Sequence, residues 1–275
     1  MKFISRFQYL PLLVFGLLVY FVALVLSFPA ERAYSHWQAS ENASPDVALS
    51  GISGSVWSGN AAQAMIQGQP LEKVEWSLRP WSLLFGQVGL SWRFQLPPEN
   101  DKESQGQGGY GQGSTALGLD GSVAFSTVEA RLPAGIIARF AKAEALRPIG
   151  SVSLNLRDVL WDGRSLHSVE GRIVWHSAGI SLLKPISLGD QAITLETSDD
   201  NVVKGVLSDG GGPLSLDGLL TLNPEGQYTF SGSFASRSAP DLERALSALG
   251  KPGADGRITL KREGSLASLG LVSGG

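Results

Sequence analysis

The stretch Gly54-Ser55-Val56-Trp57-Ser58-Gly59 opens the part of the chain whose pattern decides the fold. It is followed by Leu71-Glu72-Lys73-Val74-Glu75-Trp76, in which apolar residues are interspersed with charged ones. Six residues after the second Trp comes Ser82-Leu83-Leu84. Interspersed apolar and polar residues that follow a Gly-rich turn are typical of a half-buried β-strand.

A looser copy of this pattern occurs further along the chain. Trp161 is followed by Trp175, and Ser181-Leu182-Leu183 begins six residues after that second Trp, as in the first copy. The repeated spacing predicts two related units arranged in tandem.

The longest alternating segment lies between the two copies. Apolar residues occupy every second position from Val88 to Leu96, and the same period of two recurs at 152–156, 193–195, 214–222, 228–230 and 258–260. Turn signals such as Asp162-Gly163 and Asp255-Gly256 separate these segments. Strands joined by short turns, without crossover helices, predict a mainly β protein with a curved antiparallel sheet, whose apolar face is either covered or left as an open groove.

Two short helices interrupt the strand pattern, at about 134–146 and 240–249. In the second, Ser238 is the expected N-cap and Gly250 the expected C-cap. The segment 99–115 is rich in Gly and Gln and is expected to form a disordered loop. The predicted organisation is therefore a first β unit at 47–131 that contains this loop, and a second β unit at 132–275 that contains the helices and the C-terminal tail.

The N-terminal segment 1–28 has the composition of a membrane anchor. Leu10 to Phe28 is nineteen residues without a charge, and a helix of that length spans about 28 Å, close to the thickness of a bilayer core. A cleaved signal peptide is disfavoured because such peptides have shorter apolar regions and end at a small-x-small site. Lys2 and Arg6 precede the span, so the N-terminus is predicted to be cytoplasmic. Residues 29–46 then form a juxtamembrane segment.

Charge and composition exclude several classes of function. The formal net charge is −3, and Lys2 and Arg6 are the charged residues before Phe28, so the remainder of the chain carries −5. An acidic domain binds nucleic acid poorly because phosphate contacts require clustered Lys and Arg. The chain has no cysteine, which removes disulfides, thiol nucleophiles and Cys-type metal sites.

No motif predicts a catalytic, cofactor-binding or metal site. The string Gly106-x-Gly108-x-x-Gly111 lacks the preceding strand and following helix of a dinucleotide site. Ser181-x-x-Lys184 lacks the companion motifs of penicillin-recognising enzymes. The histidines show no helical ligand pair, although a Ser-His-Asp triad is not excluded. The tryptophans on strands are expected to fill a core rather than form a binding platform, and the role of Trp81 stays open.

The order of these features resembles the type II secretion system protein N family. The residues that carry the resemblance follow an apolar N-terminal span and are Gly54, Trp57, Gly59, Trp76, Pro80, Gly86, Trp161, Trp175 and Tyr228. The resemblance extends over most of 1–250 and assigns no catalytic residue.

The resemblance implies a non-enzymatic accessory subunit in the inner membrane of a Gram-negative cell. It would face the periplasm and help to export folded proteins through contacts with other secretion subunits and with exported proteins. An alternative, by analogy with AsmA-like proteins, is that a curved β-groove binds lipid or another hydrophobic ligand. No cofactor and no nucleic acid is expected in either case.

Overall fold

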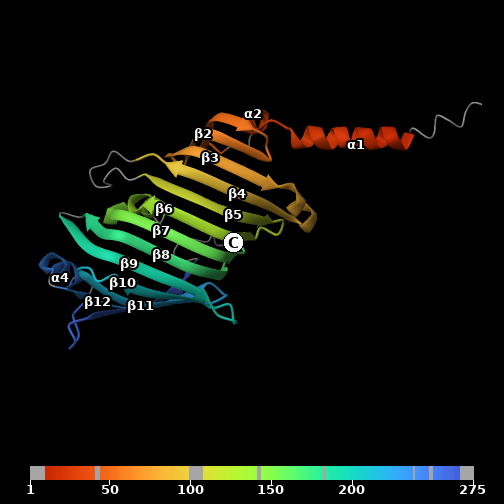
Figure 1. Ribbon diagram of the computed structural model, residues 1–275. Helices are drawn as coiled ribbons and strands as arrows, with labels where there is room; N and C mark the ends of the chain where they lie inside the picture. Colours follow the sequence, from red (N-terminus) through yellow and green to blue (C-terminus); the bar gives the residue numbers. More distant parts are fainter. Residues whose placement is uncertain are drawn as a thin grey trace, which may run out of the picture.

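The computed structural model describes residues 10–40, 44–98, 108–140, 144–181, 184–237, 239–247 and 250–266. The strands of these residues form one sheet in which every strand pairs antiparallel with its neighbours in sequence order, and the sheet is curved (Figure 1). The strands are β1 Val47–Gly54, β2 Ser58–Ile66, β3 Gln69–Arg79, β4 Gln87–Leu96, β5 Gly109–Gly118, β6 Val123–Pro133, β7 Pro148–Trp161, β8 Leu166–Ser181, β9 Pro185–Thr197, β10 Val203–Asp209, β11 Leu214–Leu222, β12 Gln227–Ser236 and β13 Ile258–Ser265. The prediction of a mainly β, antiparallel fold is confirmed.

The chain reverses direction after every strand, in some places through a short turn and in others through a helical segment. Between β7 and β8, Gly163 has a φ of +89°, a conformation in which a Cβ atom is unfavourable. The carboxylate of Asp162 accepts hydrogen bonds from the backbone N–H groups of Arg164 and Ser165 in the same turn. A polar side chain and a glycine together close the reversal.

The two faces of the sheet differ in polarity. Leu154, Ile173 and Ile193 are cross-strand neighbours on β7, β8 and β9, and Leu207 on β10 continues the same row. We call this apolar side the inner face. The alternate positions, such as Arg172 between Ile173 and Gly171, belong to the opposite side, the outer face, because successive strand residues point to opposite faces.

The helix α4, Pro240–Ser247, covers the inner face over the last strands. Its Leu242 and Leu246 pack against buried Leu214 and Leu216 of β11 and Ile258 of β13. These leucines form a compact cluster at the C-terminal corner of the sheet.

The structure describes both predicted helices in part. The first is α3, Ala134–Phe140, followed by the 3₁₀ turn η2, Glu144–Leu146, and 141–143 lie outside the described residues. The expected N-cap Ser238 and the expected last residue Leu249 of the second helix also lie outside them.

Part of the expected disordered loop is instead a strand. Residues 109–115, within the segment 99–115, belong to β5, which pairs with both β4 and β6. The glycines are there for steric reasons: a Cβ on Gly111 would lie 2.5 Å from the ring of Phe94, and one on Gly113 would lie 2.7 Å from the ring of Trp92. Composition suggested a polar coil, whereas the neighbouring aromatic rings require glycine. Residues 99–107 lie outside the described part.

The sheet continues without interruption across the predicted boundary between the units at 131/132. Trp57 precedes β2 and Trp76 lies on β3, whereas Trp161 ends β7 and Trp175 lies on the adjacent β8. One whole strand therefore separates the first pair but not the second. The division into two related units stays a prediction from the sequence.

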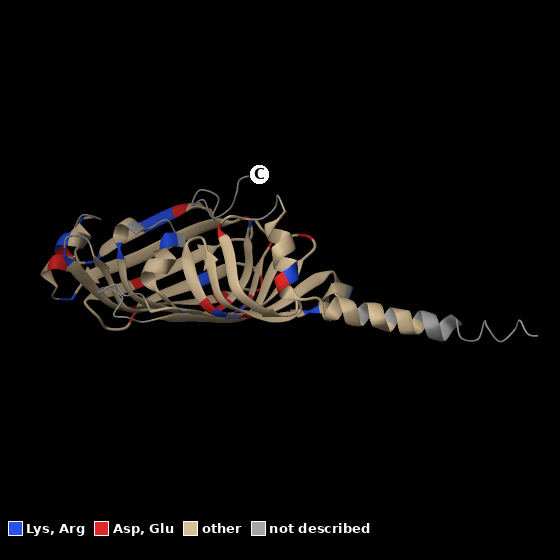
Figure 2. Ribbon diagram, turned by 90° about the horizontal axis from the view of Figure 1, so that it is seen from above, with Lys and Arg blue, Asp and Glu red and all other residues tan. Residues whose placement is uncertain are grey.

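The N-terminal part contains two helices, α1 Leu10–Leu26 and α2 Ala30–Gln38. Within the expected span Leu10–Phe28 lies the helix α1, Leu10–Leu26, which is seventeen residues long and contains no charged residue (Figure 2). Among the helices of the described residues, none combines the length and the apolar character that crossing a membrane requires.

Candidate functional site

The Gly54–Gly59 stretch connects β1 to β2 and contacts the end of α1. The indole N–H of Trp57 donates to the carbonyl of Val25 at 2.9 Å, and the backbone N–H of Val56 donates to the carbonyl of Phe28 at 3.0 Å. Carbonyls at the end of a helix lack an intrahelical partner. The loop therefore satisfies them and attaches the helix to the sheet. We call this contact the helix junction.

Both glycines of the stretch are required by the local backbone. Gly54 has a φ of +89°, and a Cβ there would lie 2.6 Å from the carbonyl oxygen of Ser58. A Cβ on Gly59 would lie 2.5 Å from Cζ2 of Trp76 and 2.7 Å from the carbonyl oxygen of Ser53. The ring of Trp76 thus lies over Gly59, its cross-strand neighbour.

Trp76 and Leu78 hold the loop from β3. The indole N–H of Trp76 donates to the carbonyl of Val56 at 3.0 Å, and the backbone N–H of Leu78 donates to the carbonyl of Trp57 at 2.6 Å. The helix junction is therefore stabilised by a relay of hydrogen bonds from β3 through the loop to Val25.

Pro80 and Gly86 bound the segment that follows β3. Pro80 begins the 3₁₀ helix η1, Pro80–Phe85, where its missing N–H needs no partner. Gly86 ends it in the left-handed conformation at φ +70°. The side chains of Trp81 and Phe85 between them are 77% and 82% exposed, so Trp81 is not a core residue.

The remaining residues of the predicted signature lie elsewhere. The indole of Trp175 donates to the carbonyl of Ile149 at 2.8 Å, Trp161 ends β7, and the ring of Tyr228 lies over Gly264 on β13. These three are on β7, β8 and β12. The structure brings together Gly54, Trp57, Gly59 and Trp76 at the helix junction. Pro80 and Gly86 bound η1, and the other members lie on other strands.

The expectation that the strand tryptophans fill a core needs correction. The four signature tryptophans are half-buried rather than buried. Trp76 donates its indole N–H to the carbonyl of Val56 in the β1–β2 loop, and Trp175 donates its own to the carbonyl of Ile149 on the neighbouring strand β7. Each ring therefore keeps part of its surface accessible.

The described residues contain no group of three metal-ligating His, Cys, Asp or Glu side chains. His167 Nε2 lies 2.6 Å from Asp162 Oδ2. This hydrogen bond, together with the backbone N–H groups of the turn, holds the pKa of Asp162 well below its usual range. No serine hydroxyl among the described residues is hydrogen-bonded to His167. The pair stabilises the β7–β8 turn.

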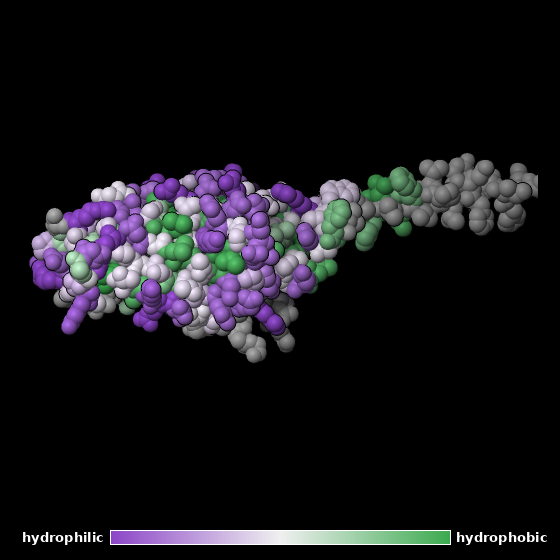
Figure 3. Space-filling model, turned by 90° about the horizontal axis from the view of Figure 1, so that it is seen from below, coloured by the Kyte–Doolittle hydropathy of each residue, from purple (hydrophilic) through white to green (hydrophobic). Residues whose placement is uncertain are grey.

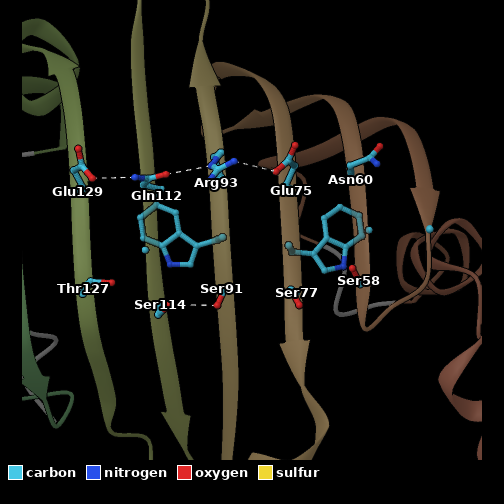
Figure 4. Close-up of a pocket in the computed structure, with 15 residues that line it drawn as sticks. Ser58, Asn60, Glu75, Ser77, Ser91, Arg93, Gln112, Ser114, Thr127 and Glu129 are labelled. Atoms are coloured by element: carbon cyan, nitrogen blue, oxygen red, sulfur yellow. Dashed lines mark hydrogen bonds and ion pairs between the residues drawn. The ribbon is translucent and has the colours of Figure 1, made fainter.

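Sequence reasoning missed a polar groove on the outer face of β2–β6. It has a volume of about 730 Å³ and is bordered by two cross-strand rows (Figure 4). Arg93 lies 3.7 Å from Glu75 and donates to Gln112, which in turn donates to Glu129. The second row consists of small hydroxyl residues, Ser58, Ser77, Ser91, Ser114 and Thr127. The sequence shows which positions of each strand are polar. It does not show how the strands are aligned with one another, and this alignment is what brings the polar positions together.

Fold and site together define a class of protein: an open antiparallel meander with an apolar helix fixed to one corner through a Gly–Trp loop. A family model described as "Type II secretion system (T2SS), protein N" matches residues 45–261, which contain strands β1 to β12 and the first half of β13. The chain belongs to the type II secretion system protein N family, and membership implies a role in type II secretion.

Individual relatives agree with this assignment. The chain is similar to type II secretion system protein N of Aeromonas hydrophila, with 27% identity over 91% of this chain and 96% of the relative. It is 26% identical to the protein N of Vibrio cholerae, over 92% of this chain and 98% of the relative. It is 29% identical to the protein N of Klebsiella pneumoniae, over 91% of this chain and 93% of the relative. No solved structure matches the chain.

Proposed function

We propose that this protein is a non-enzymatic accessory component of the type II secretion system, attached to the inner membrane and acting in the periplasm through protein contacts. The observation that carries the proposal is the family match over 45–261, which covers the sheet from β1 into β13. The signature residues support it, because those at the helix junction hold the backbone and present no reactive group.

Attachment to the membrane is supported by the surface of α1. Its side chains include Phe15, Leu17 and Phe21, each 65% exposed, which is unfavourable in water. Lys2 and Arg6 precede the helix, so by the positive-inside rule the sheet would lie on the periplasmic side.

Protein contact is supported by the outer face. The row from Glu75 through Arg93 to Glu129 presents both signs of charge, and the exposed pair Val206 and Leu219 lies on the same face, further along the sheet. Protein interfaces commonly combine apolar residues with polar ones.

In vivo photo-crosslinking tests the proposal. A benzophenone amino acid would replace Gln112, Val206 or Leu219 in the full chain, in cells that carry out type II secretion. We expect adducts with another secretion subunit or an exported protein. A set of folded variants that gives no adduct at any of these positions would contradict the proposal.

A second candidate function is binding of a lipid or another hydrophobic ligand on the inner face. The specific observation is that Leu154, Ile173 and Ile193 form one apolar row and are all only half-buried. The helix α4 covers the inner face only at the C-terminal corner. An accessible apolar row of this length is suited to an acyl chain.

Neighbouring residues provide a matched test of this second function. The benzophenone amino acid at Ile173 reports on the inner face, and at Arg172 on the outer face of the same strand. Phospholipid labelled with ³²P should be captured at position 173 and not at 172. Equal capture at both positions, or none at 173, would count against a lipid in the groove.

A further inference from the structure

Large apolar side chains are exposed at one end of the sheet. Trp81, Phe85 and Leu119 are 77%, 82% and 82% exposed, with Leu83 and Leu117 at 48% and 41% beside them. We call these five residues the apolar end patch. Isolated exposed apolar residues are common, but a contiguous group of this size marks a contact surface.

The patch is held in place by the backbone. The N–H of Leu119, in the turn between β5 and β6, donates to the carbonyl of Gly86 at 3.2 Å. A Cβ on Gly86 would lie 3.8 Å from Leu119. The η1 helix and the β5–β6 turn are therefore neighbours, and their exposed side chains form one surface.

The same end of the sheet carries α1. Val25 of α1 accepts a hydrogen bond from Trp57, and the carbonyl of Trp57 accepts one from Leu78, two residues before η1 begins. Figure 1 shows α1 projecting from this side of the sheet, and Figure 3 shows hydrophobic residues where the helix meets the rest of the molecule.

Charge near the patch is balanced. Arg79 precedes η1 and Asp120 follows Leu119. The carboxylate of Asp120 accepts hydrogen bonds from the N–H and the hydroxyl of Ser122, which lower its pKa. A surface with one charge of each sign and large aromatic side chains suits the interface of a bilayer, where Trp and Phe are buried at the headgroup level.

We propose that the apolar end patch inserts into the interface of the bilayer to which α1 is attached, as a second point of membrane contact. The occupant is lipid rather than protein, because the exposed apolar surface of α1 leaves the sheet at the same end and would bring the bilayer there. This inference rests on the proposed membrane attachment. Two contacts, unlike one, would fix the tilt of the sheet relative to the membrane.

The absence of cysteine from the chain permits a direct test. A single cysteine at Phe85→Cys is labelled with an environment-sensitive fluorophore in the full chain, reconstituted into nanodiscs that contain lipid with a shallow or a deep spin-label quencher. Leu17→Cys reports on α1, and Val206→Cys, which is 54% exposed on the outer face, is the control. Leu119→Cys replaces Phe85→Cys if that variant fails to fold.

We expect the shallow quencher to reduce the fluorescence of the label at position 85 and the deep quencher to reduce that at position 17. The label at position 206 should be quenched by neither. Quenching at 17 without quenching at 85 would overturn the patch contact while leaving membrane attachment in place. Protection of position 85 from aqueous iodide without lipid quenching would show a protein partner and also overturn it. Quenching at none of the three positions would overturn both the patch contact and the attachment.

Discussion

The two corners of the sheet use the same alternating strands but are stabilised in different ways. At the N-terminal corner the fully buried apolar residues of β2 are Ala61 and Ala64, and α1 is attached through hydrogen bonds to the loop around Trp57. At the C-terminal corner α4 buries Leu242 and Leu246 against β11 and β13. Alternation alone makes a sheet with an apolar side. One packed cluster on this sheet forms under α4, and a second, around Val169, Val203 and Leu222, is made without a helix residue.

The C-terminal corner is also stabilised by ion pairs. Next to the leucine cluster, Arg237 donates to both carboxylate oxygens of Asp209, at 2.7 and 3.1 Å, and Arg257 links Ser215 to Asp217. The side chain of Asp209 is only 9% exposed, so this bidentate pair is stronger than a surface salt bridge. The C-terminal corner is built for stability, and the N-terminal corner for holding an attached helix.

The largest expected effect is at the leucine cluster. Leu242→Ala removes a side chain that is 2% exposed, and should lower the free energy of unfolding by about 3 kcal/mol through lost burial and a cavity. Leu219→Ala, at a residue that is 46% exposed, is the control and should change it by less than about 0.5 kcal/mol. Thermal unfolding of the full chain in detergent, followed by circular dichroism, measures both. Equal effects would mean that the corner is not packed as described.

A somewhat smaller effect is expected from Asp209→Asn. Losing the charge weakens the hydrogen bonds from Arg237 and should cost roughly 2 kcal/mol at pH 7. The pKa of Asp209 is lowered from its ordinary 3.8, chiefly by the hydrogen bonds from Arg237. The stabilisation is therefore present above about pH 4 and is lost as the pH falls below it. Urea unfolding at pH 7 and at pH 3 should show the difference between parent and variant shrinking at the lower pH. A difference that is independent of pH would show that the charge of Asp209 contributes nothing.

The sequence predicted the sheet well because alternation and turn chemistry are local. The turn at Asp162-Gly163, the strand from Val88 to Leu96 and the helix after 240 are each encoded within a few residues. Family membership was also accessible from the order of Gly54, Trp57 and the later signature residues.

The features that the sequence did not predict depend on contacts between neighbouring strands. Gly111 and Gly113 fall in the segment predicted to be a disordered loop. Their place in a strand depends on the rings of Phe94 and Trp92, which belong to the neighbouring strand and are not visible in the local sequence. The Glu75–Arg93–Gln112–Glu129 row was missed because its register depends on a bulge between Glu72 and Glu75. The exposure of Trp81 and Phe85 depends on what packs beside η1, which a single sequence does not specify.

Gly59→Ala tests the steric reason for the Gly–Trp loop. The added methyl would press on the ring of Trp76 and on the carbonyl of Ser53, so a loss of about 1–2 kcal/mol is expected as the ring is displaced. Gly135→Ala is the matched control, since nothing lies within 4 Å of its Cβ and it occupies α3. There alanine should stabilise the helix by up to about 1 kcal/mol. The two substitutions are chemically identical, so opposite signs in unfolding experiments would locate the cause in the ring contact, whereas equal signs would exclude it.

The smallest expected effect is at the helix junction itself, and it sharpens the contrast between the corners most directly. Trp57→Phe keeps an aromatic ring but removes the N–H that bonds Val25, at a cost of about 1 kcal/mol. Because few buried contacts connect this loop to the leucine cluster, the loss should be local. Hydrogen exchange should become faster at Val56 and at the end of α1, while the amides of β11 and β12 stay protected. If protection fell equally in β11 and β12, the two corners would unfold as one cooperative unit and the division between an attachment corner and a stability corner would be wrong.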